Sequence, residues 1–400
     1  MLFKRQYPKH NHQVGYQLWF VLGVLALIIF SLGVWQFIGF KVLTSKVKTN
    51  NAHQNSPVYV SVNGSYLFSG TIVLSRGVET YANGNYARPF SGMGSLGTYD
   101  ARVGDLECPV TTNYDSYANE VNNLVFNCSP NWLPYLLKYY PIINLSSNHL
   151  YDEGVSGFNE TVSRLNSAGF QTVGNYNPHI QPDDCKSVVL PVHAVMSSAQ
   201  AVDAFLPVAF CSYNYKSLFS PALGEIESIA RWSKIMPVIA LLNEGPEYSH
   251  TASSETVAIA HEMVDEGASL VVGNGTHWVQ NTEVYKGKLI AYSLGNFIFD
   301  QLDYDGRIAL NLEMNLSLEY STNVANWLAI GQLCHSDTAQ CLSLAQARHL
   351  TKLYPSFSYE PIGSYGGYLQ IATRATPQEQ ADIEKIANWS TTAQQLAQQP

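Results

Sequence analysis

The sequence predicts an α/β fold, because runs with the composition of buried strands are followed repeatedly by a polar loop and a segment with helical spacing. The clearest case is residues 142–154, an apolar strand that runs into a polar loop. In residues 155–168, which come next, apolar side chains recur on one helical face, and Gly169 provides a C-terminal stop. Polar residues follow strands at four places, where the sites of layered α/β folds lie.

The same patterns place the other elements along the chain. The expected strands lie at 58–62, 66–74, 187–195, 204–211, 237–242, 269–273, 289–299 and 307–316, and the expected helices at 132–140, 155–168, 222–235 and 254–267. Pro141 stops the helix before the strand at 142. Residues 81–99 are rich in Gly, Asn and Ser and predict a loop.

Composition limits the class of protein. A chain of 400 residues with 46% hydrophobic content buries a large core, in one big domain or two modest ones. Charged residues make up only 13% and tyrosine is abundant at 25, which is typical of an extracytoplasmic surface. The net charge of −9, without a basic stripe, argues against a nucleic-acid partner.

Residues 18–40 form an apolar segment without a charged residue. As a helix it would be roughly 34 Å long at about 1.5 Å per residue, enough to span a bilayer. Trp19 and Trp35 near its ends fit the two interfaces, and no small-residue cleavage site follows, so an uncleaved anchor is expected. The predicted organisation is a cytoplasmic tail at 1–17, a transmembrane anchor at 18–40, a linker at 41–57, the main domain at 58–320 and a C-terminal extension at 321–400.

The cysteines indicate the orientation of this anchor. Lysines on both sides leave the positive-inside rule nearly tied. All six cysteines follow the segment and no Cys-x-x-Cys pair occurs, which predicts three disulfides in an oxidising compartment. A single-pass protein of the cell membrane, with a cytoplasmic N-terminus and an extracellular main domain, is therefore expected; the alternative is reduced thiols in a cytosolic domain. Sequence order favours the pairs Cys108–Cys128, Cys185–Cys211 and Cys334–Cys341, although other pairings stay open.

The four polar clusters hold the candidate site residues. They are Asp105 with Glu107, Asn148 with His149, Asn243 with Glu247, and Asn274 with His277. Loops from several strand ends that converge make a site, so the recurrence means more than any one cluster. The alternative for residues 148–152 is a turn that starts a helix, and for His149 and His277 a structural, hydrogen-bonded histidine.

Several short motifs lie at 70–76, 105–107, 147–154, 243–248 and 273–277, and the sequence Tyr-Ser-Leu-Gly-Asn-Phe lies at 292–297. In their order and residue types these motifs resemble those of the CapA family, the PgsA-like proteins of poly-γ-glutamate capsule production. The family's domain is similar to calcineurin-like metallophosphoesterases. The resemblance implies a four-layer α/β/β/α sandwich and an extracytoplasmic role in making or exporting an anionic cell-surface polymer. The implied partners are the membrane, the capsule-polymer synthesis subunits and the polymer itself.

The resemblance also implies roles for individual residues. In metallophosphoesterases two metal ions hold a hydroxide for in-line attack on phosphorus. Carried over, the catalytic residues are His149, Asp152 and Arg76, with His149 as general acid. The metal ligands are Glu107, Asn148 and His277. The other site residues are Thr71, Asp105, Asn243, Glu247, Asn274 and Asn296.

Three positions depart from the family pattern. Thr71 stands in place of an aspartate, and Asn243 and Asn274 in place of histidines. Neutral amides and hydroxyls are weak ligands, so the site is expected to hold one divalent ion (Mn²⁺, Zn²⁺ or Mg²⁺) or none rather than two. The sequence leaves two functions open: a polymer- or partner-binding capsule protein with a degenerate metal site, and a metal-dependent phosphoester hydrolase with a rebuilt, single-metal site.

Overall fold

The computed structural model describes residues 59–113, 115–180, 184–198, 200–216, 220–222 and 224–398. These residues belong to one of the chain's two units, Pro57–Pro400. The predicted tail, anchor and linker lie outside the described residues. Within the part of the chain that is described, no helix is long and apolar enough to cross a membrane.

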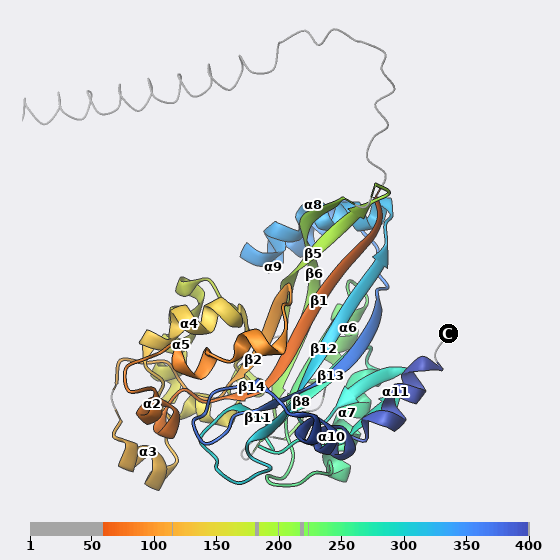
Figure 1. The fold of residues 1–400 in the computed structure, drawn as a ribbon. Coiled ribbons are helices and arrows are strands. Elements are labelled where there is room, and N and C mark those ends of the chain that lie inside the picture. Colours follow the sequence, from red (N-terminus) through yellow and green to blue (C-terminus); the bar gives the residue numbers. More distant parts are fainter. Residues whose placement is uncertain are drawn as a thin grey trace, which may run out of the picture. The chain divides into compact units, whose positions relative to one another are not determined.

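The sheet is assembled on one long strand, β1 (Tyr59–Ile72), which pairs with four others (Figure 1). On one edge its first half pairs with β5 (Cys185–Met196), and its second half with β2 (Ala101–Leu106). On the other edge it pairs first with β12 (Ile308–Glu319) and then, at its end, with β11 (Asn296–Ile298). The strand therefore changes neighbours on both edges along its length.

A glycine lies near each change of neighbour. A Cβ at Gly64 would lie 2.0 Å from the hydroxyl of Tyr66, and one at Gly70 would lie 1.9 Å from the carbonyl oxygen of Gly295. The Gly295 carbonyl is backbone and cannot move aside, so the close approach of β1 to residue 295 requires glycine at position 70. At Gly64 the nearest atom is the end of the Tyr66 side chain, which belongs to β1 itself.

Two arms of the sheet extend from β1. In the first, β2 is followed by the parallel strands β3 (Ile142–Asn144) and β4 (Gln171–Val173). The second runs outward from β5 through β6 (Ala201–Asn214), β7 (Val238–Asn243), β8 (Leu270–Asn274), β10 (Lys288–Ala291) and β9 (Thr282–Tyr285). At the edge formed by β12, the sheet continues through β13 (Ser356–Tyr365) and β14 (Thr373–Arg374).

The structure is thus a sheet-rich, mixed α/β fold, as the alternating pattern predicts. Hydrogen bonding joins the described strands into one sheet of 14 strands. The two arms are joined because β1 pairs with β2 of the first arm and with β5 of the second.

Helices accompany both arms (Figure 1). Beside the first arm lie α2 (Arg76–Ala82), α3 (Tyr117–Asn123), α4 (Leu133–Tyr139) and α5 (Gly154–Ala168). Along the second arm lie α6 (Glu227–Ser233), α7 (Ser254–Asp265), α8 (Thr322–Ser336) and α9 (Thr338–Ala347), and near β13 and β9 lie α10 (Pro377–Ile386) and α11 (Trp389–Ala397).

Two hydrophobic cores result from this arrangement. Ile142 belongs to the core shared with the second arm, and its neighbour Ile143 to the core under α4 and α5. Both side chains are fully buried. Because successive side chains of a strand point to opposite faces, β3 is buried on both sides, and its two isoleucines precede the polar Asn144.

Element boundaries differ from the predicted ones in informative places. The strands expected at 58–62 and 66–74 are the single strand β1. The strand expected at 289–299 is two, β10 and β11, because Gly295 has a positive φ of 74° between them. The loop expected at 81–99 contains two 3₁₀ turns. The segment after residue 320 adds β13 to the sheet, paired with β12.

The three disulfides are present in the pairing that sequence order favours. Cys185–Cys211 joins directly opposed residues of β5 and β6. Cys334–Cys341 links α8 to α9. Cys108–Cys128 ties the loop after β2 to the segment that leads into α4.

Replacing Gly70 with alanine tests the close approach of β1 to residue 295. We expect Gly70→Ala to lower the free energy of unfolding by about 1–3 kcal/mol, or to prevent folding, because the methyl group overlaps a backbone carbonyl. The matched control is Gly94→Ala, where a Cβ meets nothing within 4 Å; it should change stability by no more than about 0.5 kcal/mol. Denaturant unfolding measures both, and equal stabilities would contradict the expectation.

Candidate functional site

The polar residues predicted from sequence lie in two rows at the ends of parallel strands. In the first row Thr71 of β1 pairs with Asp105 of β2 and with Asn296 of β11. Asp105 pairs in turn with Asn144 of β3. The carboxyl ends of parallel strands meet at one edge of a sheet, which is why residues far apart in sequence become neighbours here.

The second row contains only asparagines: Asn214 of β6 pairs with Asn243 of β7, and Asn243 with Asn274 of β8. The amide of Asn243 also donates to Asn214 Oδ1 at 2.9 Å. Asn144 joins the rows at one end, since its Oδ1 accepts from Ser212 Oγ of β6 at 2.5 Å. We call the two rows, with the loops that follow them, the strand-end site.

Asp105 is the buried carboxyl of the first row. It accepts from Asn144 Nδ2 at 2.7 Å and from Thr71 Oγ1 at 3.4 Å. Burial, helped by the negative charge of Glu107, raises the pKa of Asp105 to about 8, although the two hydrogen bonds act in the opposite direction. Burial therefore favours the neutral form of this side chain.

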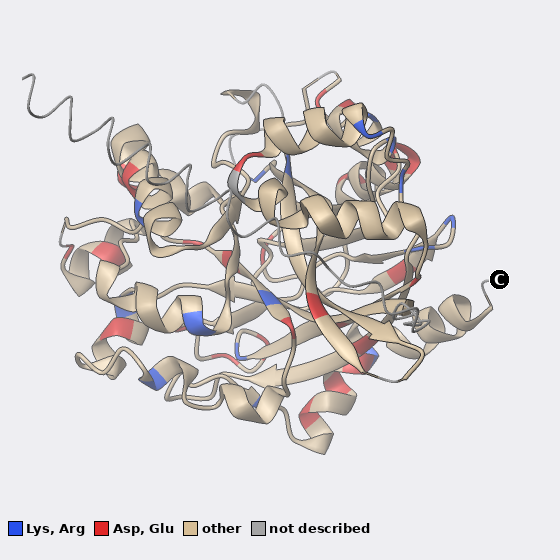
Figure 2. Ribbon diagram, turned by 90° about the horizontal axis from the view of Figure 1, so that it is seen from above, with Lys and Arg blue, Asp and Glu red and all other residues tan. Residues whose placement is uncertain are grey.

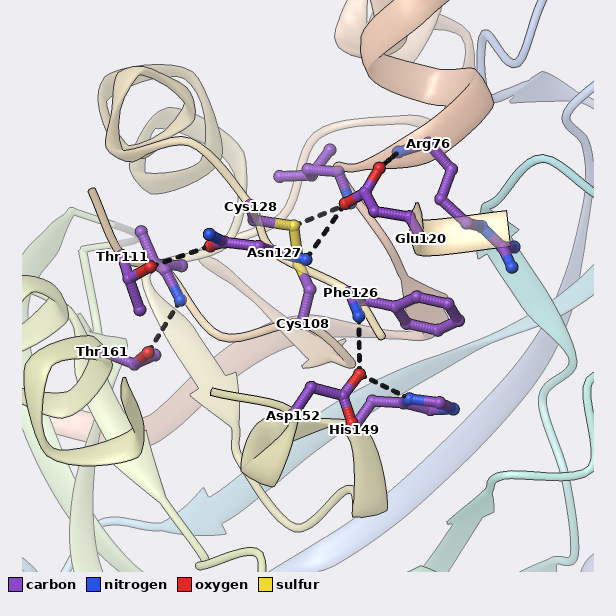
Figure 3. Close-up of a disulfide and its surroundings, with 12 residues drawn as sticks. Arg76, Cys108, Thr111, Glu120, Phe126, Asn127, Cys128, His149, Asp152 and Thr161 are labelled. Atoms are coloured by element: carbon purple, nitrogen blue, oxygen red, sulfur yellow. Dashed lines mark hydrogen bonds and ion pairs between the residues drawn. A yellow bond between two sulfur atoms is a disulfide. The ribbon is translucent and has the colours of Figure 1, made fainter. Parts of the chain in front are cut away.

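His149 lies in a 3₁₀ turn, η4 (Asn148–Tyr151), directly after β3. Its Nδ1 is 2.8 Å from Asp152 Oδ2, which also accepts from the backbone N–H of Phe126 at 2.6 Å (Figure 3). The ring of Phe126 stacks on the imidazole with 4.0 Å between centroids. Burial acts to lower the pKa of His149, but the hydrogen bond to Asp152 and the charges of Glu107 and Asp152 outweigh it and raise the pKa. The imidazole is thus held in one orientation with its protonated form favoured.

Arg76 is buried at the start of α2 rather than free to meet a ligand. Its guanidinium pairs with Asp300 and lies between the rings of Phe126 and Phe299, 4.4 and 5.0 Å from their centroids. Its backbone adopts a φ of 50°, and its N–H donates to Glu120 Oε2 at 2.9 Å (Figure 3). Such a backbone conformation persists only where surrounding contacts enforce it.

His277 connects the loop after β8 to the first row. Its Nδ1 lies 3.0 Å from Asn296 Oδ1, and its Nε2 lies 4.0 Å from Glu247 Oε1. The half-exposed ring of Tyr248 stacks beside it with 5.7 Å between centroids. Both His277 and Tyr248 have positive φ values, 64° and 58°. With the Ser212–Asn144 bond at the other end, this contact joins the two rows at both ends.

The donor set fits a two-metal centre poorly. Among the described residues, no group of three or more His, Cys, Asp or Glu side chains is placed to hold a metal ion. The predicted ligand His277 contacts Asn296 and Glu247, and no contact joins it to Glu107 or Asn148 in the described structure. Buried oxygens of Glu107, Asn148 and Asn274 have no hydrogen-bond partner. These oxygens are open to a single cation or to the N–H and O–H donors of a ligand.

The part of the chain that holds the strand-end site matches a known protein family. The family model described as "Bacterial capsule synthesis protein PGA_cap" matches residues 65–301, which include both rows. The chain belongs to this family. The resemblance seen in the sequence motifs is thereby confirmed.

Relatives within the capsule synthesis family are similar over part of their length. The capsule biosynthesis protein CapA of Bacillus anthracis is 31% identical over 173 residues, 40% of this chain and 41% of that protein. The PGA biosynthesis protein CapA of Bacillus subtilis (strain 168) is 27% identical over 209 residues, 50% of this chain and 54% of that protein. A probable polyglutamine synthesis accessory protein of Mycobacterium tuberculosis is 23% identical over 226 residues, which are 53% of this chain and 59% of that protein. The chain spans about half the length of these relatives.

Among solved structures, the calcineurin-like phosphoesterase YfkN from Bacillus subtilis matches with a TM-score of 0.39 and 10% identity, over 84% of this chain and 99% of that chain. A hypothetical protein from Thermus thermophilus matches with a TM-score of 0.37 and 15% identity, over 64% of this chain and 94% of that chain.

Three charged residues of the site were not among those predicted from the sequence of the chain. Lys216 follows β6, and its Nζ lies 3.4 Å from Glu247 Oε1. The others are Asp300, which pairs with Arg76, and Glu120, which holds the Arg76 backbone. The sequence held a signal for Lys216, because Asn214 and Lys216 follow an apolar strand just as the other polar clusters do. It was missed because that strand was expected to end at residue 211.

The pH dependence of stability tests the role of Glu120. Burial raises its pKa from 4.5 to about 7, against the hydrogen bonds from the Asn127 and Arg76 amides. Since the folded pKa is the higher one, its contribution to stability is complete below pH 4.5 and is lost as the pH rises to about 7. We expect the wild type to lose about 1–3 kcal/mol relative to Glu120→Gln over this range, measured by denaturant unfolding.

The control for this experiment is Glu227→Gln, a change at an exposed carboxylate at the start of α6. Its stability should follow that of the wild type at every pH. Curves for Glu120→Gln and wild type that run parallel over the same range would contradict the assigned role.

Proposed function

We propose that this member of the capsule synthesis family takes part in the synthesis or export of an anionic cell-surface polymer of the poly-γ-glutamate type. In this proposal it is anchored in the cell membrane, its strand-end site binds the polymer, and the metal site is degenerate. The observation that carries the proposal is that three uncharged residues, Thr71, Asn243 and Asn274, stand at the strand ends. The two arms of the sheet would form the middle layers of a four-layer sandwich.

The chemistry of the site suits a γ-linked glutamate chain, which presents carboxylates and amide N–H groups together. The unpartnered, buried oxygens of Glu107 and Asn148 are acceptors for N–H donors. The imidazolium of His149, favoured by its surroundings, is a donor for a carboxylate. At the surface the ring of Tyr248 is 48% exposed and supplies an apolar contact for the methylene groups of the chain.

An extracellular main domain is part of the proposal. The charge-free segment at 18–40 and the placement of all six cysteines after it support this orientation. The three disulfides support an oxidising compartment, because such bonds rarely persist in the cytosol. Figure 2 shows Lys, Arg, Asp and Glu scattered over the described part of the chain with both signs interspersed.

Thiol labelling of cells that express the full chain tests this orientation. We expect a thiol-reactive maleimide to label no cysteine in the denatured, unreduced protein and all six after reduction. A cysteine introduced at Ser95, which is exposed, should react with a membrane-impermeant maleimide added to intact cells. Labelling of six cysteines without reduction, or protection of residue 95 in intact cells, would refute the proposed topology.

A hydrolase is the second candidate, and the pair formed by His149 and Asp152 favours it. An imidazole that is oriented by a carboxylate, and whose pKa that carboxylate raises, is equipped to act as a general acid on a leaving group. The two candidates differ in turnover. The binding protein makes no product, whereas the hydrolase cleaves phosphoesters in a reaction that depends on His149.

One experiment with two readouts decides between them. The full chain, purified in detergent, is assayed for hydrolysis of a phosphodiester with added Mn²⁺ and for binding of fluorescent poly-γ-glutamate. We expect hydrolysis no faster than in His149→Ala. We also expect binding weakened about 3- to 10-fold by Tyr248→Ala, because truncating an aromatic contact typically costs about 1 kcal/mol.

The matched control is Tyr354→Ala, since Tyr354 is 80% exposed and precedes β13, away from the strand-end site. It should bind the polymer as the wild type does. Mn²⁺-dependent turnover that His149→Ala abolishes would establish the hydrolase instead, and equal binding by both tyrosine variants would exclude the strand-end site as the polymer site.

A further inference from the structure

A buried lysine lies among the loops that follow the second row. Lys216 follows β6, and its side chain is only 8% exposed. Its Nζ donates to the carbonyl oxygens of Gly275, at 2.6 Å, and Gly245, at 3.0 Å. The carboxylate oxygen Glu247 Oε1 lies 3.4 Å away. One ammonium therefore contacts the loops after both β7 and β8 from its own position after β6.

The hydrogen-bonding capacity of this ammonium is used within the protein. A lysine ammonium has three N–H donors, and three oxygen atoms lie within reach. Two of the donors bind carbonyl oxygens and the charge pairs with Glu247, so the contacts of this ammonium lie within the protein. The ammonium links the loop after β7 to the loop after β8.

In the loops after β7 and β8, the glycines whose carbonyl oxygens contact Lys216 have an unusual backbone conformation. Gly245 and Gly275 have positive φ values of 107° and 92°. A Cβ at Gly275 would lie 1.9 Å from Asn243 Oδ1, so no larger residue fits there without a shift of the row beneath. The two carbonyl oxygens that face Lys216 thus depend on glycine at both positions.

The three acceptors are the kinds of oxygen that bind hard divalent cations. Backbone carbonyls and a carboxylate are the ligands that Ca²⁺, Mg²⁺ and Mn²⁺ prefer. Here they surround an ammonium, while Asn243 and Asn274 beside them are neutral. We propose that Lys216 is the built-in cation of the strand-end site, taking the place of a divalent ion at the loops after β7 and β8 and making that half of the site independent of metal.

This inference deepens the proposed function, since it rests on the strand-end site being the working part of the molecule. It predicts which half of the site stays open. The second half has its two loop carbonyls and Glu247 held by Lys216 and leaves Asn274 Oδ1 unpartnered, whereas the first half leaves the oxygens of Glu107 and Asn148 for a cation or for ligand donors. The wild type should therefore bind one divalent ion per chain at most.

The first test uses the unmodified full chain. Equilibrium dialysis against Mn²⁺ should give no more than one ion per chain. Two ions per chain would overturn the proposal without any variant having to fold.

The second test removes the ammonium. Lys216→Ala leaves Glu247 and two carbonyl oxygens without their cation, so the melting temperature should fall by about 5 °C or more. Ethylammonium or Ca²⁺ should recover much of that loss, because either supplies a cation to the space left by the side chain. Lys216→Met leaves no such space and should be destabilised without recovery.

The matched control is Lys186→Ala on β5, where Nζ donates to the carbonyl oxygen of Thr172 at 3.3 Å, away from the strand-end site. Neither ethylammonium nor Ca²⁺ should change its melting temperature beyond their effect on the wild type. If the two cations raise the melting temperatures of Lys216→Ala and Lys186→Ala equally, Lys216 is not the cation of the site. These readouts are stability and metal content, so they fail independently of polymer binding and turnover.

Discussion

The pairing of β1 with four strands is the constraint on which the site depends. Because β1 exchanges neighbours on both edges, its last residues lie between β2 and β11, and Thr71 comes to lie between Asp105 and Asn296. The same strand holds β5 at its other end, and β5 carries the second arm with its asparagine row. A shift of one residue in β1 would turn Thr71 to the other face and separate the two rows.

Within that frame the charged side chains are fixed in pairs. Arg76 pairs with Asp300, His149 with Asp152, and Lys216 with Glu247. Three of the residues that meet here, Arg76, Tyr248 and His277, have positive φ values, a conformation that costs free energy in any residue with a side chain. Glu120 accepts from the backbone N–H of Arg76, Gln301 donates to the hydroxyl of Tyr248, and Asn296 Oδ1 contacts Nδ1 of His277, so each of the three residues is held in place. The site is therefore rigid before any ligand arrives, which lowers the entropy that a ligand must lose.

The parts of this fold that the sequence predicted are those that local pattern determines. Each strand end with its polar cluster could be predicted, because an apolar run followed by Asn, His or Glu is visible within ten residues. The disulfide pairs followed from their order. The role of β1 could not be predicted, since strand neighbours depend on contacts between residues hundreds of positions apart. Lys216 was missed for a related reason: a lysine in a polar loop normally lies in water, and its burial here depends on three loops meeting.

The two halves of the strand-end site therefore differ in what they leave for a ligand. The first half has a buried Asp105 with a raised pKa, an oriented His149, and unpartnered oxygens on Glu107 and Asn148. In the second half two carbonyl oxygens and the Glu247 carboxylate already share an ammonium, and Asn274 Oδ1 has no hydrogen-bond partner. A metal ion must be captured from the surroundings at each site, whereas a lysine is present in every copy of the chain. A site built this way keeps its shape when divalent ions are scarce, and Asn243 and Asn274 need not bind a metal for the fold to hold. The asymmetry directs any binding to the side of His149.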